Sequence, residues 1–318
     1  MHAYARHADK IQAAIKSSDA ARSALVASWQ RSASLHRLDP AEHKPPLRLT
    51  SAELRMAHQR IEPLIRTAQV SLDRLYLAVG GVGCCVLLAD TNGIPVDRRG
   101  ASGDDRTFET WGLWTGTVWS EDAEGTNGIG TCIVEQRTLT IHADQHFLDR
   151  NTGLSCTTAP IFDHEGNLAA ALDVSSCRAD LTEGFAGLIS MAVADAARRI
   201  EADHFRQMFP EARILLAPPQ DKHAGGLLAI DRDDLVIGAT RAARMSLGLT
   251  SDQLAKPLPA GDLLGKRELG GGALREAERA VLQRALARSD GNVAAAARLL
   301  GVSRATLHRK LNRLEMSR

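Results

Sequence analysis

Residues 273–318 hold the pattern that most constrains this chain, a series of short helical segments separated by turn signals. Apolar residues recur at helical spacing from Leu274 to Leu286, and Asp290-Gly291-Asn292 then marks a turn. The side chain of Asn292 can cap a second helix, Val293–Leu300, and Gly301 ends that helix where a left-handed residue is favoured. The sequence therefore predicts two helices joined by a turn, with a further tight turn at Gly301.

A third helix is predicted directly after this turn. Ser303 is a capping residue type, and Leu307, Leu311 and Leu314 form one apolar stripe. The residues off that stripe are rich in hydrogen-bond donors. Two short helices joined by a tight turn that contains glycine are typical of a helix-turn-helix, whose second helix enters the major groove of DNA. A helical hairpin that serves only to join two copies of a chain is the alternative.

The distribution of charge favours a polyanionic partner for this region. The chain has 318 residues with 39 Lys+Arg against 38 Asp+Glu, so its net charge of +1 alone indicates no such partner. Residues 273–318 contain ten basic and four acidic side chains, which makes this segment +6 and the rest of the chain −5. A basic end on an acidic body is typical of nucleic-acid binding at that end, although a solvated helical tail gives the same balance.

Residues 273–318 resemble the Fis-type DNA-binding domain, through the run Gly291-Asn292-Val293-Ala294-Ala295-Ala296-Ala297-Arg298-Leu299-Leu300-Gly301-Val302-Ser303-Arg304-Ala305-Thr306-Leu307. The resemblance implies a homodimer that binds double-stranded DNA with its two recognition helices in successive major grooves. Arg304 is expected to contact a base edge, because paired guanidinium bonds to guanine are the commonest specific contact. Arg309 and Lys310 are expected to contact phosphates. The positions that match DNA-facing residues of the family are Ser303, Arg304, Thr306, His308, Arg309 and Lys310.

Residues 1–272 predict a mixed α+β body. Apolar spacing in residues 1–75 indicates helices, including one that Ser51 caps, and a long helix is expected over Phe185–Phe209. Between them, short apolar runs separated by turn signals indicate strands of an antiparallel sheet. Helices that bracket such a sheet give an α+β fold rather than an α/β fold. The expected strands are Cys84–Asp90, Ile94–Asp97, Thr131–Glu135, Thr138–His142, Ser155–Phe162 and Leu168–Val174.

A cluster of tryptophans precedes a glycine-rich loop in this body. Three of the four Trp residues, Trp111, Trp114 and Trp119, fall within nine residues, and Ser120–Thr131 follows directly. Aromatic walls beside a flexible polar loop are typical of a small-molecule pocket. An aromatic cluster in the core with a turn next to it gives the same pattern, so the sequence leaves both interpretations open.

The order of these signals resembles the GAF sensor domains of acetoin-type regulators, from about Ser28-Trp29-Gln30-Arg31 to about residue 205. The shared strings are Trp119-Ser120-Glu121, Gly125–Thr131, His146-Phe147-Leu148, Cys156–Ile161 and Leu172-Asp173-Val174-Ser175. The resemblance implies a sensor for an unidentified small-molecule effector, with no cofactor. Its ligand stays unassigned, because GAF domains bind diverse molecules on one scaffold. The residues expected to line the effector pocket are Trp111, Trp114, Trp119, Asn127, Ile129, Thr131, His146, Cys156 and Asp173.

These patterns divide the chain into four segments. A helical region is expected over residues 1–75, the GAF sensor over 76–209 and the Fis-type domain over 273–318. Residues 210–268 resemble the first part of a PAS domain, because Leu227–Asp231 and Leu235–Ala239 predict a hairpin and the residues from Arg241 predict a helix. The stretch is too short for a full domain of that type, so a reduced PAS-like segment and a hairpin-helix spacer are both retained as interpretations.

Regulators of this kind commonly carry an ATP-hydrolysing motor between the sensor and the Fis-type domain. A phosphate-binding loop requires GxxxxGK[ST], whereas the nearest string, Gly261–Arg267, has the wrong spacing and no hydroxyl after Lys266. The stretch between Phe205 and Ala273 is also too short for such a motor. We therefore expect a regulator without ATPase activity that recruits RNA polymerase, represses by occupancy or antagonises longer relatives.

The cysteines and histidines give weaker signals. Five cysteines without a CxxC pair argue against a disulfide framework and a structural zinc site. His142 and His146 are four residues apart but fall in an expected strand end and loop, so no metal site is predicted there. Cys156 is expected to be a buried thiol rather than a redox sensor.

We predict a regulator rather than an enzyme. A GAF-based methionine sulfoxide reductase is an alternative that five thiols permit, but such an enzyme would not require a helix-turn-helix. A second alternative is a DNA-binding scaffold whose sensor binds no ligand. The lack of a long apolar segment and of a signal peptide predicts a cytoplasmic protein with no membrane partner.

Overall fold

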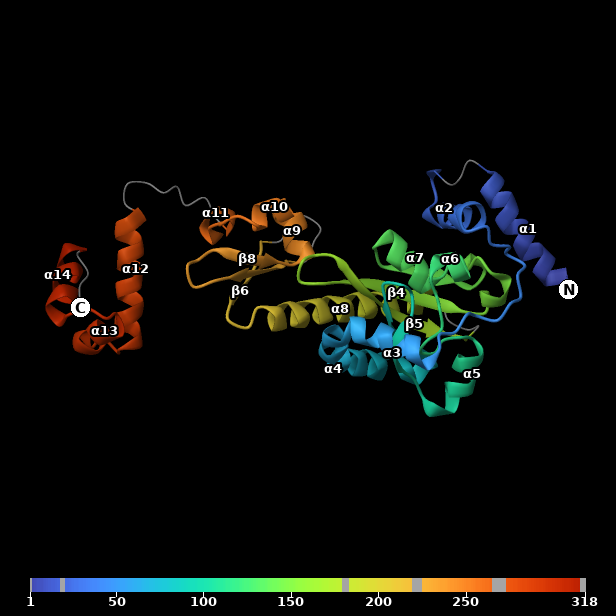
Figure 1. Ribbon diagram of the computed structural model, residues 1–318, viewed down its shortest axis with the longest axis horizontal. Helices are drawn as coiled ribbons and strands as arrows, with labels where there is room; N and C mark the ends of the chain where they lie inside the picture. The colour runs from blue at the N-terminus through green and yellow to red at the C-terminus, as the bar shows by residue number, and fades with distance from the viewer. Residues whose placement is uncertain (1, 18–20, 179–182, 219–224, 265–272, 315–318) are drawn as a thin grey trace. The chain divides into compact units, whose positions relative to one another are not determined.

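The computed structural model of the chain describes residues 2–17, 21–178, 183–218, 225–264 and 273–314 (Figure 1). The chain divides into two compact units, Met1–Ala260 and Gly261–Arg318. The first contains the α+β body that the sequence predicts, and the second contains the predicted helical domain. Within the described residues, no helix has both the length and the apolar character needed to cross a membrane.

A five-stranded sheet forms the centre of the first unit. Its strands are β1 (Cys84–Asp90), β2 (Pro95–Arg99), β3 (Leu139–His142), β4 (Ser155–Phe162) and β5 (Leu168–Ser176). They lie in the order β2-β1-β5-β4-β3, and each neighbouring pair is antiparallel. Thr158 of β4 lies opposite Asp173 of β5. Because successive residues of a strand face opposite sides, Cys84 and Cys85 enter different apolar clusters.

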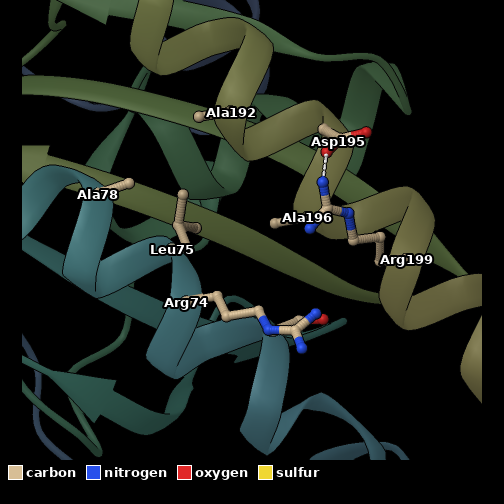
Figure 2. Close-up of a pocket in the computed structure, with 8 residues that line it drawn as sticks. Arg74, Leu75, Ala78, Ala192, Asp195, Ala196 and Arg199 are labelled. Carbon is tan, nitrogen blue, oxygen red and sulfur yellow. Dashed lines mark hydrogen bonds and ion pairs between the residues drawn. The ribbon is translucent and has the colours of Figure 1, made fainter.

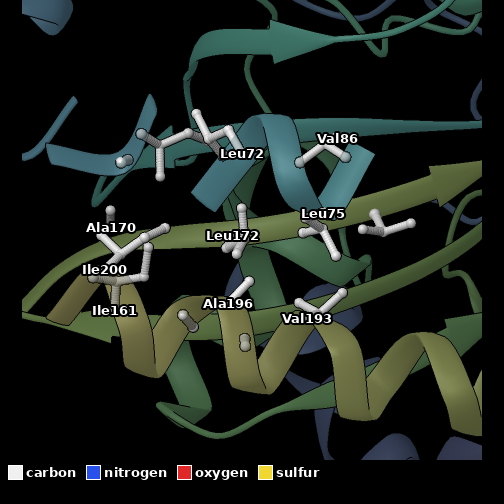
Figure 3. Close-up of a cluster of buried hydrophobic side chains, with 14 of the residues drawn as sticks. Leu72, Leu75, Val86, Ile161, Ala170, Leu172, Val193, Ala196 and Ile200 are labelled. Carbon is white, nitrogen blue, oxygen red and sulfur yellow. The ribbon is translucent and has the colours of Figure 1, made fainter. Parts of the chain in front are cut away.

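Two long helices cover one face of this sheet. They are α4 (Glu62–Val79) and α8 (Glu183–Met208). Figure 3 shows Leu72 and Leu75 of α4 and Val193 and Ile200 of α8 gathered around Leu172 of β5. These side chains are almost completely buried, because each helix carries its apolar residues along one stripe. The long helix predicted over Phe185–Phe209 is confirmed as α8.

Short helices cover the other face. They are α5 (Asp105–Thr110), α6 (Glu121–Glu124) and α7 (Gly128–Glu135). Two predictions were wrong here: Ser120–Thr131 contains α6 and the start of α7 rather than one loop, and Thr131–Glu135 is helical rather than a strand. Asn127 caps α7, because its side-chain oxygen accepts the N–H of Gly130 at 2.8 Å. A Cβ on Gly128 would lie 2.6 Å from that of Cys156, so glycine lets α7 begin directly against the sheet.

The N-terminal helices pack against this sensor body. They are α1 (His2–Lys16), α2 (Ala24–Gln30), the π-helical turn η2 (Arg31–Leu35) and α3 (Ser51–Arg60). Trp29 of α2 is buried with Phe147 in one apolar cluster. The residue that caps α3 is Thr50 rather than the predicted Ser51, because Thr50 and Glu53 form a reciprocal capping box. Short 3₁₀ turns join the elements at η3 (Gly80–Val82), η4 (Ser102–Asp104), η5 (Ala143–Gln145) and η6 (Asp149–Asn151).

A second, three-stranded sheet follows α8. It contains β6 (Arg213–Leu216), β7 (Leu227–Ile230) and β8 (Val236–Ala239), paired antiparallel in that order. β7 and β8 form the predicted hairpin. β6 was not predicted, because Arg213–Leu216 does not alternate between apolar and polar residues; in the structure its side chains are exposed or half-buried. Short helices α9 (Arg241–Leu247), α10 (Ser251–Leu254) and α11 (Ala260–Leu264) follow. The likeness of this segment to a PAS domain stays a prediction.

The described part of the second unit contains the three predicted helices, α12 (Ala273–Arg288), α13 (Val293–Leu299) and α14 (Arg304–Arg313). Asn292 caps α13, because its side-chain oxygen accepts the N–H groups of Ala294 and Ala295 at 3.0 and 3.2 Å. Gly301 has a φ of 66° in the turn between α13 and α14, as the sequence predicts. The shared core contains Leu282, Ala285, Ala296, Ala297, Leu307, Leu311 and Leu314.

Candidate functional site

Helix α14 presents polar side chains away from the core of the second unit. Ser303 caps the helix, because its hydroxyl accepts the N–H of Thr306 at 3.1 Å. Arg304 and Arg309 are exposed, and Thr306 and His308 are half-buried. In a helix-turn-helix, the N-terminal residues of the second helix contact base edges. The position of Arg304 at the start of α14 fits that geometry.

Lys310 differs from the other residues predicted to contact DNA. Its ammonium group and the guanidinium group of Arg313 both pair with the carboxylate of Glu278 on α12. The hydrogen bond from Lys310 and the charge of Arg313 hold the pKa of Glu278 below its ordinary value. Lys310 therefore joins α14 to α12, and its contact with phosphate stays a prediction.

Three of the predicted effector residues lie in the packed core beneath α7. Trp119 is 1% exposed and belongs to one apolar cluster with Ile129 and Cys156, against which Trp111 also packs. The Nε1 of Trp119 donates to the carbonyl oxygen of Gly112 at 2.9 Å. The structure brings these four residues together in and around one apolar cluster. Their contact with an effector stays a prediction.

Trp114 and His146 lie in two further environments. Trp114 is half-buried beside the guanidinium group of Arg98, whose central carbon lies 4.2 Å from the ring centroid. His146 is fully buried, its Nδ1 lies 3.0 Å from the carbonyl oxygen of Ala143, and burial lowers its pKa to about 4. His146 is therefore neutral at pH 7. Among the described residues, no group of three or more His, Cys, Asp and Glu side chains has the arrangement of a metal site.

Asp173 is a fully buried carboxylate beneath the start of α7. Its two oxygens accept hydrogen bonds from the hydroxyl groups of Thr158 and Ser175, both at 2.6 Å. Burial raises the pKa of Asp173 to about 6, and the two hydrogen bonds oppose that rise. A Cβ on Gly128 would lie 3.1 Å from the Oδ1 of Asp173. The backbone of α7 therefore packs directly over this carboxylate.

The thiol groups are poorly suited to redox chemistry. Cys84, Cys85, Cys132 and Cys156 are buried, and Cys177 is half-buried. Burial raises the pKa of all five thiols above the ordinary value. The thiolate is the reactive form, so almost none is present at neutral pH. These environments give no support to the methionine sulfoxide reductase alternative.

A buried polar network joins α2 and η2 to the sensor. Arg31 donates to both carboxylate oxygens of Glu121, at 3.0 and 3.2 Å, and to Glu135 at 3.3 Å. The hydroxyl of Ser28 lies 3.1 Å from Glu121 and 2.7 Å from the hydroxyl of Thr126. None of these roles is predicted from the sequence, although the residues other than Glu135 fall in strings that resemble the GAF family. One sequence does not tell which of those strings meet in space.

Three cavities in the described part of the first unit are candidates for ligand binding. One of about 140 Å³ lies between α4 and α8, where Leu75 and Ala78 face Ala192 (Figure 2). A second of about 140 Å³ lies between α2, α7 and β3, and its lining includes Ser28 and Thr131. A third of about 460 Å³ lies along η2, α6 and α7. Thr131 is the one predicted effector residue in the linings of these three cavities.

Comparison with known families assigns a domain to each unit. Residues 63–200 match the GAF domain, and residues 273–314 match the Fis family of bacterial regulatory proteins. The GAF match begins within α4, before the boundary predicted at residue 76. The physical reason is that α4 supplies buried residues such as Leu72 to the core over the sheet.

Curated relatives include regulators of several operons. The chain is 34% identical over 224 residues to the acetoin catabolism regulatory protein of Cupriavidus necator. This alignment covers 69% of this chain and 34% of that protein. It is 28% identical over 234 residues to the propane 2-monooxygenase operon transcriptional activator MimR of Mycolicibacterium smegmatis (72% and 38%). It is 28% identical over 178 residues to the acetoin dehydrogenase operon transcriptional activator AcoR of Bacillus subtilis (56% and 29%). The chain thus matches about a third of the length of these relatives.

A solved structure shares the fold. The E. coli DhaR(N)–DhaL complex aligns with a TM-score of 0.51 and 17% identity over 80% of this chain and 86% of that chain. At this identity the likeness shows the fold alone. The domain matches and the curated relatives agree with the motifs in the two units. The chain therefore contains a GAF domain followed by a Fis-type helix-turn-helix, and it is homologous to the acetoin catabolism regulators.

Proposed function

We propose that this protein is a cytoplasmic transcriptional regulator that binds double-stranded DNA through α14 and responds to a small-molecule effector through its GAF domain. The observation that carries the proposal is the exposed side of α14, where Arg304 and Arg309 project from a helix capped by Ser303. The Fis-family match covers this helix. The curated relatives are named as regulators or transcriptional activators, which supports the same role.

The exposed basic residues have separate roles in this proposal. Arg304 reads a guanine in the major groove, because a guanidinium group can donate two hydrogen bonds to the O6 and N7 atoms of that base. Arg309 contacts a phosphate and contributes affinity without sequence preference. The pairing of Lys310 with Glu278 leaves Arg309 as the more available cation on this helix.

The proposed mechanism does not use ATP. Residues 201–272, between the two domain matches, contain no string of the form GxxxxGK[ST] that a phosphate-binding loop requires. The regulator therefore acts by recruiting RNA polymerase, by occupying a promoter, or by competing with longer relatives at shared DNA sites.

A homodimer is part of the proposal, because two recognition helices in successive major grooves require two copies of the chain. The first unit offers a surface for this contact on the outer side of α4 and α8. The exposed apolar side chains on α4 are Val70 (60% exposed) and Leu77 (83%), and those on α8 are Leu188 (63%) and Met191 (71%). Exposed apolar side chains that form one contiguous surface mark protein contacts, and we propose that these four form such a surface. We expect Leu77→Glu to halve the mass measured by light scattering, and an unchanged dimer mass would place the contact elsewhere.

The DNA-binding function is tested by selection from a random pool of double-stranded DNA. Purified protein should enrich a common sequence, and a gel-shift assay should then show specific binding to it. Arg304→Ala should abolish the preference for that sequence and leave the oligomeric mass unchanged. Arg284→Ala is the matched control, because it removes the same charge from an exposed position on α12 that is not predicted to contact DNA.

Two results would overturn the proposal. One is failure of the wild-type protein to enrich any sequence. The other is equal affinity of Arg304→Ala and the wild type for an enriched sequence, which would show that α14 does not read bases.

A further inference from the structure

The cavity between α2, α7 and β3 has the size of a small metabolite. Its volume is about 140 Å³. An apolar cavity of about 150 Å³ in another protein accommodates benzene, so this volume admits about six non-hydrogen atoms. Ser28, Thr126 and Thr131 in its lining are buried, whereas Ala24 and Arg137 are exposed at its rim. The cavity is therefore deep on the sensor side and open to solvent at one edge.

Its lining combines hydroxyl groups with apolar walls. Ser28, Thr126, Thr131 and Thr140 contribute hydroxyls, and the apolar part includes Leu139. The Thr131 hydroxyl accepts the N–H of Asn127 at 3.2 Å, and within the described residues its own O–H has only a 3.4 Å contact, with Ser28. A contact of that length is a weak hydrogen bond. Thr131 can therefore donate to a molecule in the cavity.

The charged residues of the lining neutralise each other. The carboxylate of Glu135 pairs with Arg137 at 2.5 Å and with Arg31 at 3.3 Å. No unpaired charge among the described lining residues is available for an ion. A buried ion without a partner carries a large desolvation cost. The cavity is therefore suited to a neutral molecule.

Helix α2 supplies one wall of the cavity and the sensor supplies the rest. Ala24, Leu25 and Ser28 come from α2, and the other lining residues come from α7, β3 and the adjoining turns and loops. The Nε1 of Trp29 donates to the carbonyl oxygen of Gln145 at 2.8 Å, and Gln145 also lines the cavity. A bound molecule would touch both parts. The bound molecule would therefore stabilise the state in which α2 is packed against the sensor. The size of that stabilisation equals the difference between the molecule's binding free energies for the states with α2 packed and with α2 detached.

We propose that this cavity is the effector site of the GAF domain, that it binds a neutral hydroxylated or carbonyl-containing molecule of about six non-hydrogen atoms, and that α2 is its cover. This inference rests on the proposed function and assigns it a place and a ligand class. Thr131 donates to an oxygen of the ligand, and Leu25 and Leu139 pack against its carbon atoms.

Isothermal titration of the full-length protein tests the site. The probes are 2,3-butanediol and acetoin, which are neutral and of the expected size, and lactate, which has a similar size and carries a charge. We expect saturable binding of at least one neutral probe and none of lactate. Thr131→Val should weaken binding of the neutral probe at least tenfold, whereas Thr110→Val, at an exposed position on α5, should leave it unchanged.

A second variant keeps the test valid if Thr131→Val perturbs the cap of α7. Leu25→Phe fills the cavity from α2, leaves the hydroxyl network in place and should abolish probe binding. Amide hydrogen exchange in α2 should slow when the neutral probe is added. The proposal is overturned by absence of binding for both neutral probes, by lactate binding as tightly as they do, by unchanged binding in both variants, or by unchanged exchange in α2.

This experiment separates the site from the wider function. Specific DNA binding without probe binding would refute the site and leave the regulator intact, as a scaffold with a ligand-free sensor would behave. Probe binding that depends on Thr131, in a protein that selects no DNA sequence, would support the site and refute the regulator.

Discussion

Replacement of Arg31 by alanine should lower the free energy of unfolding of the first unit by about 3 kcal/mol. Arg31 binds both oxygens of Glu121, whose side chain is 1% exposed, and it also reaches Glu135. Its removal leaves the Glu121 carboxylate buried with a hydroxyl of Ser28 as its remaining described side-chain partner. Breaking a buried ion pair in this way costs about 3–5 kcal/mol. We take the lower end because the side chain of Arg31 is 29% exposed.

Tryptophan fluorescence isolates this unit in the intact protein. All four Trp residues, Trp29, Trp111, Trp114 and Trp119, lie in the first unit. For a domain of this size, 1 kcal/mol corresponds to about 2–4 °C in Tm. Arg31→Ala should therefore lower the Tm of the fluorescence transition by about 6–12 °C.

Two further variants identify the cause of this loss. Arg66→Ala breaks an exposed pair with Glu62, whose side chains are 69% and 48% exposed, and should cost about 0.5 kcal/mol or less. Glu121→Gln in the Arg31→Ala background should recover much of the stability, because a neutral amide needs no counter-charge. A loss for Arg31→Ala no larger than for Arg66→Ala would refute the argument, as would a double variant no more stable than Arg31→Ala alone.

Three other outcomes follow from the described contacts. The pKa of Asp173, raised from 3.8 to about 6, means that the folded state binds its proton more tightly than the unfolded state does. The free energy of unfolding should therefore fall by about 2 kcal/mol between pH 4 and 6, and Asp173→Asn should remove that part of the fall in a urea denaturation series. Ser303→Ala removes the acceptor for the N–H of Thr306 and should destabilise α14 by about 1 kcal/mol, measured as a lower Tm by circular dichroism; an unchanged Tm would argue against the cap. The logarithm of DNA affinity should fall linearly with the logarithm of salt concentration, and Arg309→Ala should reduce that slope by about one; an identical slope would exclude its phosphate contact.

The second unit could be predicted almost completely from the sequence. Asn292, Gly301 and Ser303 act through contacts within a few residues, and each adopts the capping or turn role that its type indicates. The apolar stripe Leu307–Leu311–Leu314 requires only helical periodicity. Lys310 is the exception, because its pairing with Glu278 spans 32 residues and depends on how α14 lies against α12.

The first unit shows where sequence patterns mislead. The run from Ser120 to Thr131 contains three glycines and many polar residues, which is typical of a loop. Most of this run is helical in the structure. α7 begins at Gly128, which lies directly against Cys156 and Asp173, and the side chain of a larger residue there would collide with these two residues. The glycines therefore reflect close packing between helix and sheet rather than local freedom.

The sequence by itself determined the α+β class, most of the strands, the long helix α8 and the helix-turn-helix, because periodicity and capping act over short distances along the chain. Only the tertiary structure decided which of the predicted residues are packed and which line open space. Trp119, Ile129 and Cys156 lie in a buried apolar cluster, while Thr131 faces a cavity together with Ser28, a residue more than a hundred positions earlier in the chain. Burial and cavity shape depend on contacts between distant segments, and no local pattern in the sequence encodes which of those segments meet.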